Sequence, residues 1–123
     1  MAACRVLVVD DDAVILELVA EALTEMGYAV DTAAGGAEAL DRLAHTEPAV
    51  LLLDLRMPRV SGWDVARALQ EAGRVRPCVV VMTAAQDARV WAHEAGATRY
   101  LAKPFDLSEL LDAVDEACAW FSA

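Results

Sequence analysis

Four of the five short apolar runs in this 123-residue chain are followed directly by a side chain that carries a charge or a hydroxyl group. The residues that follow these runs are Asp10, Asp11 and Asp12 after the first, Asp54 after the third, Thr83 and Ala84 after the fourth, and Lys103 and Pro104 after the fifth. Carboxylates packed close together repel one another, so some of them must be protonated or share a cation. Mg²⁺ meets this need, because it typically takes one or two protein carboxylates together with phosphate oxygens and water. The residues therefore predict a site for Mg²⁺ and phosphate, provided that the fold brings the run ends together.

A carboxylate at such a site can also act as a nucleophile and form an aspartyl phosphate. A phosphoryl group in transfer spreads negative charge over its oxygens, so it needs cations and hydrogen-bond donors around it. Lys103 can supply the cation, Thr83 a hydroxyl group, and the backbone N–H groups near Ala84 further donors. Lys103 is the only lysine in the chain, whereas the other nine basic residues are arginine. No His, Cys or Ser is placed to perform this chemistry instead.

Each of these residues also has a simpler interpretation. Asp12 can cap the helix that follows it, Thr83 can be an ordinary turn residue, and Lys103 can be a surface charge. The functional interpretation is favoured because the residues fall together at the ends of apolar runs.

Alternating apolar runs and amphipathic segments predict the elements that must position these residues. The apolar runs predict β-strands at Arg5–Val9, Tyr28–Thr32, Ala49–Leu53, Cys78–Met82 and Arg99–Ala102. The amphipathic segments predict helices at about residues 13–26, 37–44, 63–72, 87–95 and 107–121. Five βα units in a row favour an α/β fold, a five-stranded parallel doubly wound sheet with helices on both faces. Ligands of such sheets bind outside the carboxyl ends of the strands, where the charged residues are expected to meet.

Helix-capping residues support these boundaries. Ser61 and Asp64 form a capping-box pattern before the third helix. Asp106 is expected to cap the fifth helix, with Glu109 three residues later.

Composition limits the class of protein. The length suits one domain over residues 1–123. Ten basic and twenty acidic residues give a net charge of −10, and such a surface repels phosphate backbones, so direct nucleic-acid binding by this chain is not expected. No apolar run is long enough to span a bilayer, and the first residues have no signal-peptide layout. We therefore expect no membrane association and a cytoplasmic location.

Three cysteines complete the inventory of reactive side chains: Cys4, Cys78 and Cys118. Their number is odd and their spacings match no zinc or disulfide framework. All three are interpreted as small, mostly buried residues in a reducing compartment.

In their order and spacing, the motifs resemble the receiver domains of two-component response regulators. The resemblance covers essentially the whole chain. It is carried by Val8-Val9-Asp10-Asp11-Asp12, Leu53-Asp54-Leu55-Arg56-Met57-Pro58 with Gly62 following, Met82-Thr83-Ala84, and Tyr100-Leu101-Ala102-Lys103-Pro104-Phe105. It implies a flavodoxin-like fold in which a βα unit is repeated five times.

The resemblance implies a metal site and a phosphoacceptor. Asp54 looks like the phosphoacceptor and a metal ligand. Asp11 looks like a direct Mg²⁺ ligand, Asp10 acts largely through metal-bound water, and the backbone carbonyl of Arg56 completes the metal shell. Gly62 would allow the loop after the phosphoacceptor to turn tightly.

The resemblance also implies phosphate-binding and switch residues. Thr83 would bond a phosphoryl oxygen, the backbone near Ala84 would donate to the phosphate, and Lys103 would pair with another oxygen. Tyr100 matches the aromatic residue that swings inward when the threonine moves. The peptide bond between Lys103 and Pro104 is expected to be cis, a form that is costly except before proline.

The implied function is that of a phosphoacceptor in a two-component or phosphorelay system. A sensor histidine kinase or phosphotransfer protein would pass its phosphoryl group in line to Asp54, with Mg²⁺ as an electrostatic clamp. The chain would catalyse only its own phosphorylation and dephosphorylation and is not otherwise expected to be an enzyme. Phosphorylation would switch the face formed by residues 87–95, 99–102 and 107–121, on which a homodimer would also form.

A few residues depart from the commonest pattern of the family. Ala85 is small and apolar and Arg56 is large and basic, and in the family these two positions tune how fast the phosphoryl group is lost. The phosphoryl lifetime is therefore open. Trp91 is interpreted as packing partly against the core, with a partner contact as the alternative, and His93 as a solvated surface residue.

Two other functions fit part of the pattern. Asp10 and Asp12 are spaced like the paired aspartates of haloacid-dehalogenase-like phosphatases, but a late acidic pair and a cap insertion are missing, and Asp54 would have no role. A pseudo-receiver that is never phosphorylated would have the same fold, yet here all the acceptor-site residues are present. Turnover of a small phosphate ester would favour the first alternative, and failure to bind Mg²⁺ the second.

Overall fold

The computed structural model describes residues 3–75, 77–84, 86, 88–97 and 99–122, the last three as backbone only. Its five parallel strands form one sheet in the order β2-β1-β3-β4-β5. The strands are β1 (Arg5–Val9), β2 (Ala29–Ala33), β3 (Val50–Asp54), β4 (Cys78–Ala84) and β5 (Arg99–Lys103). The helices are α1 (Ala13–Glu25), α2 (Gly36–His45), α3 (Gly62–Glu71), α4 (Ala88–Glu94) and α5 (Leu107–Ser122). The predicted fold class, a doubly wound parallel sheet, is confirmed.

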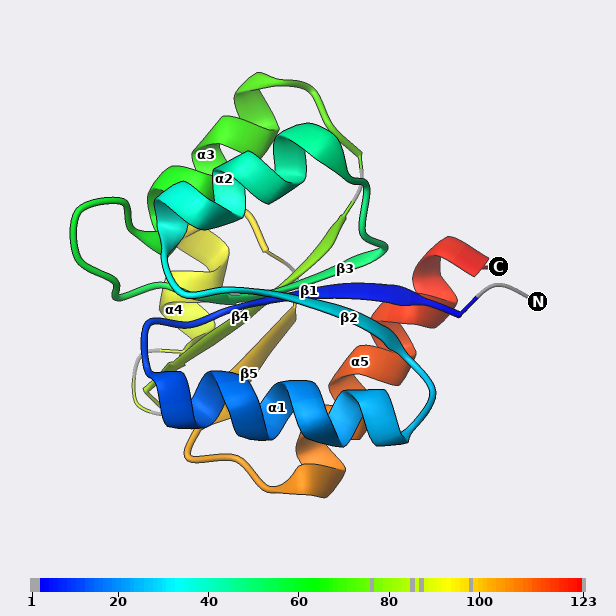
Figure 1. The fold of residues 1–123 in the computed structure, drawn as a ribbon. Coiled ribbons are helices and arrows are strands. Elements are labelled where there is room, and N and C mark those ends of the chain that lie inside the picture. The colour runs from blue at the N-terminus through cyan, green and yellow to red at the C-terminus, as the bar shows by residue number, and fades with distance from the viewer. Residues whose placement is uncertain (1–2, 76, 85, 87, 98, 123) are drawn as a thin grey trace.

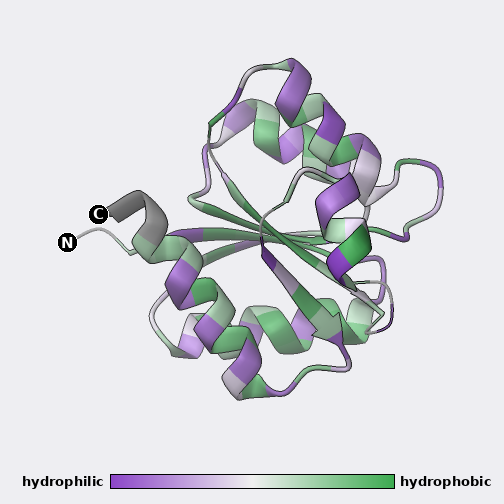
Figure 2. Ribbon diagram, turned by 180° about the vertical axis from the view of Figure 1, so that it is seen from behind, coloured by the Kyte–Doolittle hydropathy of each residue, from purple (hydrophilic) through white to green (hydrophobic). Residues whose placement is uncertain are grey.

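The sheet is covered on both faces, with α1 and α5 on one side and α2, α3 and α4 on the other (Figure 1). Successive residues of β1 point to opposite faces: Val6 and Val8 pack towards α1 and α5, whereas Leu7 and Val9 pack towards the other three helices. Figure 2 shows the hydrophobic strands at the centre of the molecule and hydrophilic stretches on the helices. This burial on both faces explains why the strands are continuously apolar in the sequence.

Four strands continue further than the apolar pattern predicts. β2 ends at Ala33, β3 at Asp54, β4 at Ala84 and β5 at Lys103, because these residues still pair across the sheet. Asp54 is opposite Met82, and Ala84 is opposite Lys103. Asp54, Thr83 and Lys103 therefore belong to the strands themselves, whereas Asp10 and Asp11 follow β1 in a loop.

The helix-capping predictions are confirmed. Asp12 accepts hydrogen bonds from the N–H groups of Val14 and Ile15 at the start of α1. Ser61 and Asp64 form a reciprocal capping box at α3. Asp106 accepts a hydrogen bond of 2.8 Å from the N–H of Glu109 at α5. These caps satisfy N–H groups that would otherwise lack partners at the helix ends.

The cysteine prediction is wrong for two of the three residues. Cys4 and Cys118 form a disulfide bond with their Cα atoms 6.3 Å apart, although they are separated by 114 residues in sequence. Only Cys78 is a free cysteine among the described residues, and it is half-buried. The start of β1 and the end of α5 lie near each other (Figure 1), a closeness that sequence spacing cannot reveal. Because disulfides are rare in reducing compartments, the cysteines do not support the expected reducing environment.

No helix among the described residues is both long enough and apolar enough to cross a membrane.

Candidate functional site

Three aspartates meet at the carboxyl edge of the sheet. Asp10, Asp11 and Asp54 each offer a carboxylate oxygen, and these oxygens lie within 4.8 Å of one another. Asp10 is completely buried and Asp54 is only 6% exposed, whereas Asp11 is open to solvent. Asp10 directly follows β1 and its Oδ1 accepts a hydrogen bond of 2.9 Å from the backbone N–H of Asp12. The sheet thus brings together acids from two separate strands, as the sequence predicts.

Lys103 places its ammonium group in this cluster. Its Nζ donates a hydrogen bond of 2.8 Å to Oδ2 of Asp10 and lies 3.5 Å from Oδ1 of Asp54. The peptide bond between Lys103 and Pro104 is cis, as expected. Burial lowers the pKa of Lys103, but the hydrogen bond to Asp10 and the negative charges of Asp54 and Asp10 outweigh this effect and raise the pKa. Lys103 therefore stays positively charged in the cluster.

Burial has the opposite consequence for Asp54. Desolvation and the negative charge of Asp10 raise its pKa to about 7, with Lys103 acting in the lowering direction and Asp11 adding to the rise. When all three acids are ionised, three negative charges face one positive charge, which leaves a net charge of −2. This hard, oxygen-rich and uncompensated set of donors fits Mg²⁺.

The raised pKa of Asp54 makes the stability of the metal-free protein depend on pH. The folded state holds the Asp54 proton up to about pH 7, whereas an ordinary aspartate releases it near 3.8. Stability should therefore fall as the pH rises through this window, and Asp54→Asn should be more stable than wild type at pH 8 by about 2 kcal/mol. Urea unfolding in EDTA at pH 5 and pH 8 measures this difference. Asp12→Asn is the control, and an Asp54→Asn protein no more stable than wild type at pH 8 would contradict the expectation.

Thr83 and Ala84 end β4 beside the acid cluster. Thr83 is 3% exposed and Ala84 is exposed. The register places Thr83 one residue beyond the partner of Asp54 and Ala84 opposite Lys103, so both lie at the same sheet edge. Ala85 occupies a position that is predicted to tune the phosphoryl lifetime, and it lies outside the described residues.

Tyr100 lies on a different surface. Its side chain is 46% exposed and lines a hollow of about 690 Å³ between α4 and β5, together with Arg89 and His93. The aromatic ring is therefore turned outward in this structure. His93 is exposed, in agreement with the sequence interpretation.

Gly62 allows two backbone segments to approach each other closely. A Cβ atom at this position would collide with the carbonyl oxygen of Asp54 and lie 2.7 Å from Cα of Leu55. The N–H of Gly62 donates a hydrogen bond of 2.9 Å to the carbonyl oxygen of Leu55. Gly62 is not among the residues with positive φ, so its importance comes from this close approach and not from the tight turn expected from the sequence.

Arg56 and two tryptophans form a stack that the sequence analysis missed. The guanidinium carbon of Arg56 lies 4.3 Å from the centre of the Trp91 ring. The rings of Trp91 and Trp63 make an edge contact with centroids 5.6 Å apart and an interplanar angle of 68°. Trp91 also packs against the core on the side of α2, α3 and α4, as predicted. No sequence signal connects these residues, because they come from a loop and two different helices.

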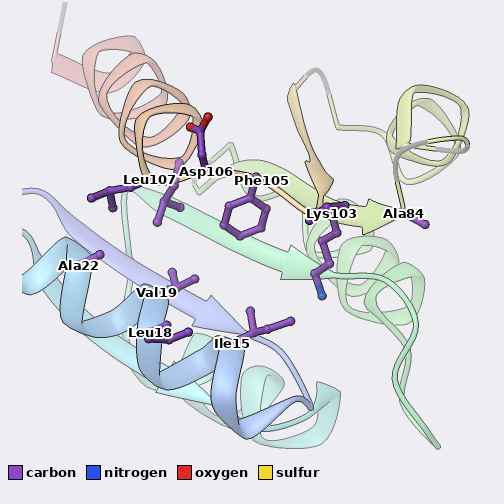
Figure 3. A pocket seen from close by; sticks show the side chains of 11 residues that line it. Ile15, Leu18, Val19, Ala22, Ala84, Lys103, Phe105, Asp106 and Leu107 are labelled. Carbon is purple, nitrogen blue, oxygen red and sulfur yellow. The ribbon is translucent and has the colours of Figure 1, made fainter.

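An apolar groove borders the acid cluster on the face of the sheet that α1 and α5 cover. It has a volume of about 650 Å³ and runs between α1 and the start of α5, with Lys103 and Ala84 at one end (Figure 3). Leu18 and Leu107 line it and remain largely exposed. The exposed hydrophobic surface of α1 therefore lies next to the charged site.

Asp12 decides against the phosphatase alternative. Its carboxylate caps α1 and does not belong to the cluster of Asp10, Asp11 and Asp54. The paired aspartates needed by such an enzyme are therefore not arranged around one pocket.

Comparisons with known proteins agree with this geometry. A family model described as "Response regulator receiver domain" matches residues 6–115. Response regulator MprA of Mycobacterium avium (strain 104) is 45% identical over 109 residues, which cover 87% of this chain and 47% of that protein. The chain thus spans about half the length of the curated relatives it matches.

Solved structures give the same result. Chemotaxis protein CheY4 of Vibrio cholerae superposes with a TM-score of 0.83 at 29% identity, over 94% of this chain and 99% of that chain. A response regulator receiver domain protein of Clostridium thermocellum superposes with a TM-score of 0.85 at 28% identity, over 98% of both chains.

Proposed function

Because the chain belongs to the response regulator receiver domain family, we propose that residues 1–123 form one receiver domain that accepts a phosphoryl group on Asp54 with the help of Mg²⁺. The observation that carries the proposal is the meeting of the Lys103 ammonium with the carboxylates of Asp10 and Asp54, at 2.8 and 3.5 Å. This arrangement combines a nucleophile, a cation and a place for a second cation at one rigid sheet edge.

In this proposal Asp11 and Asp54 would hold the metal directly, Asp10 would act through an intervening water, and the backbone carbonyl of Arg56 would be a further ligand. The metal, when bound, neutralises negative charge on the acids and on the transferred phosphoryl group. Asp10 is already occupied by hydrogen bonds from Lys103 and Asp12, which suits an indirect role.

The reaction is an in-line displacement at phosphorus. An oxygen of the Asp54 carboxylate attacks the phosphorus of a phosphohistidine, the O–P bond forms as the N–P bond breaks, and the histidine nitrogen leaves with the electron pair. Lys103 binds one phosphoryl oxygen, Thr83 donates its hydroxyl hydrogen to another, and the backbone N–H near Ala84 supplies a further donor. A raised pKa of Asp54 means that metal binding must also displace its proton near neutral pH.

Phosphorylation is proposed to change the surface formed by α4, β5 and α5. Thr83 would move towards the phosphoryl group, and Tyr100, which now points outward, would turn inward. This surface would contact an output domain or target and is also where a homodimer would form. The donor would be a sensor histidine kinase or phosphotransfer protein, and the proposed location is the cytoplasm, without direct nucleic-acid binding by this chain.

Metal binding tests the acid cluster directly. Asp11→Asn should weaken Mg²⁺ binding by at least about tenfold, since a direct carboxylate ligand and one negative charge are lost. Isothermal titration calorimetry at pH 8 measures the dissociation constant. Asp112→Asn, an exposed acid on α5, loses the same charge away from the site and serves as the control. Equal binding by both variants would remove Asp11 from the metal site, and no binding by wild type would favour a pseudo-receiver.

Phosphoryl transfer is tested with acetyl phosphate as the donor. The wild-type protein should gain one phosphoryl group, located on Asp54 by mass mapping, only when Mg²⁺ is present. A label on another residue, or a label that does not require the metal, would count against the proposed function.

A further inference from the structure

The guanidinium group of Arg56 is turned away from the acids that lie nearest to it along the chain. Arg56 follows Asp54 by two residues, at the rim of a cluster that contains three carboxylates. Its guanidinium carbon nevertheless lies 4.3 Å from the centre of the Trp91 ring. Among the described residues, no carboxylate lies within the 4.0 Å ion-pair distance of Arg56.

This placement is chemically unexpected, because arginine pairs strongly with carboxylates through its planar fork of donors. The cluster with Lys103 carries a net charge of −2 when its acids are ionised, which is the charge that a divalent cation would balance. If the Arg56 guanidinium entered the cluster, the net charge would fall to −1 and carboxylate oxygens would be occupied. An Arg56 guanidinium in that position would compete with the metal.

We propose that Trp91 is a positioning residue that holds the side chain of Arg56 out of the carboxylate cluster and so preserves the capacity of the site for Mg²⁺. The proposal rests on the proposed function in one respect, the binding of Mg²⁺ to this cluster. A cation above the face of a tryptophan is stabilised by the ring quadrupole. Trp91 thus offers Arg56 an alternative partner, and the carboxylates of the cluster remain available to the metal.

Trp63 fixes the ring that receives Arg56. Its edge contact with Trp91 has a centroid distance of 5.6 Å, and both rings pack against the core cluster beneath α3 and α4. The Trp91 ring is therefore held by α3 and the core as well as by its contact with Arg56. Because the ring is already ordered by these contacts, it can retain the cationic Arg56 side chain without a further loss of its own conformational entropy.

The test is a set of Mg²⁺ titrations by calorimetry on the full chain. Trp91→Leu should weaken Mg²⁺ binding about fivefold, which corresponds to about 1 kcal/mol for a lost cation–π contact. Trp91→Phe keeps an aromatic face and should recover most of the affinity. In an Arg56→Gln background, which keeps the backbone carbonyl, Trp91→Leu should change the dissociation constant by less than about twofold. Arg89→Gln removes an exposed arginine from the same helix as Trp91 and controls for net charge.

The outcomes separate the two proposals. If Trp91→Leu binds Mg²⁺ as tightly as wild type, or if its loss is the same with and without the Arg56 guanidinium, Trp91 does not act by holding Arg56. If Trp91→Leu does not fold, as judged by thermal unfolding, Trp91→Phe in the two arginine backgrounds decides, because a weaker affinity only where the Arg56 guanidinium is present supports retention by the ring, and an equal change or no change in both overturns it. If wild type itself binds no Mg²⁺, the proposed function fails first.

Discussion

Asp54→Asn should take up no phosphoryl group from acetyl phosphate and Mg²⁺, whereas Asp12→Asn should be labelled like wild type. The amide of asparagine is a poor nucleophile, and the replacement removes the only reacting oxygen in the proposal. Lys103 remains beside Asp10 in this variant, so the site keeps its cation but loses the acceptor. Intact-protein mass spectrometry measures the label, and fragmentation locates it.

Asp12→Asn is a matched control because the chemical change is identical and the residue lies in the loop that carries two members of the acid cluster. The Asp12 carboxylate caps α1, at 3.0 Å from the N–H of Val14, and does not belong to the cluster. Asparagine is an equally good N-cap, so α1 should form normally. A labelled Asp54→Asn protein would show that another residue is the acceptor, and an unlabelled Asp12→Asn protein would show that the loop as a whole is needed.

Lys103→Arg should be labelled on Asp54 but should lose most of the conformational response at α4, β5 and α5. The charge is kept, but a planar fork replaces a compact ammonium group that now lies 2.8 Å from Asp10 and 3.5 Å from Asp54. Asp10 is fully buried, so the space around the Lys103 ammonium is limited and the larger group cannot take the same position. The phosphoryl oxygen that Lys103 would bind is then held in a different place. The movements of Thr83 and Tyr100 that are proposed to follow phosphorylation should therefore be reduced.

Amide chemical shifts of the α4–β5–α5 surface, recorded before and after labelling, measure this response. Arg5→Lys is the control, because it makes the reverse exchange at the opposite end of the sheet, in an exposed pair with Asp31. Such exposed ion pairs contribute little to stability. A full surface response in Lys103→Arg would mean that charge alone is sufficient and that the shape of the ammonium group has no role.

Much of the fold was predictable because its main determinants are local or periodic. Each of the five predicted strands and helices is present, and boundaries differ by one or two residues. The caps of α1, α3 and α5 follow from side chains that bond backbone groups two or three residues away. The strand ends were placed one or two residues too early at β2, β3, β4 and β5, because a polar residue such as Thr83 ends an apolar pattern but does not end a hydrogen-bonded ladder.

The membership of the acid site was also predictable, because a parallel doubly wound sheet places all its carboxyl strand ends at one edge. Asp10, Asp54 and Lys103 are therefore placed at the same edge before any side-chain contact is known. The pKa of Asp54 was not predictable, since it depends on burial and on the distances to Asp10, Lys103 and Asp11. The role of Gly62 also differs from the predicted tight turn, because only the tertiary structure shows that the backbone of Asp54 lies against it.

The order of strands and helices, their caps and the gathering of reactive groups at one sheet edge were thus determined by the sequence itself, because each depends on neighbouring residues or on the regular geometry of a parallel sheet. Only the tertiary structure decided the partners of Cys4 and of Arg56. Cys4 meets Cys118 because the start of β1 and the later part of α5 lie near each other, and Arg56 lies on Trp91 because α4 packs beside the loop after β3. Contacts of this kind join segments far apart in the chain. Their energies depend on distance and orientation in space, which the spacing of residues along the sequence does not determine.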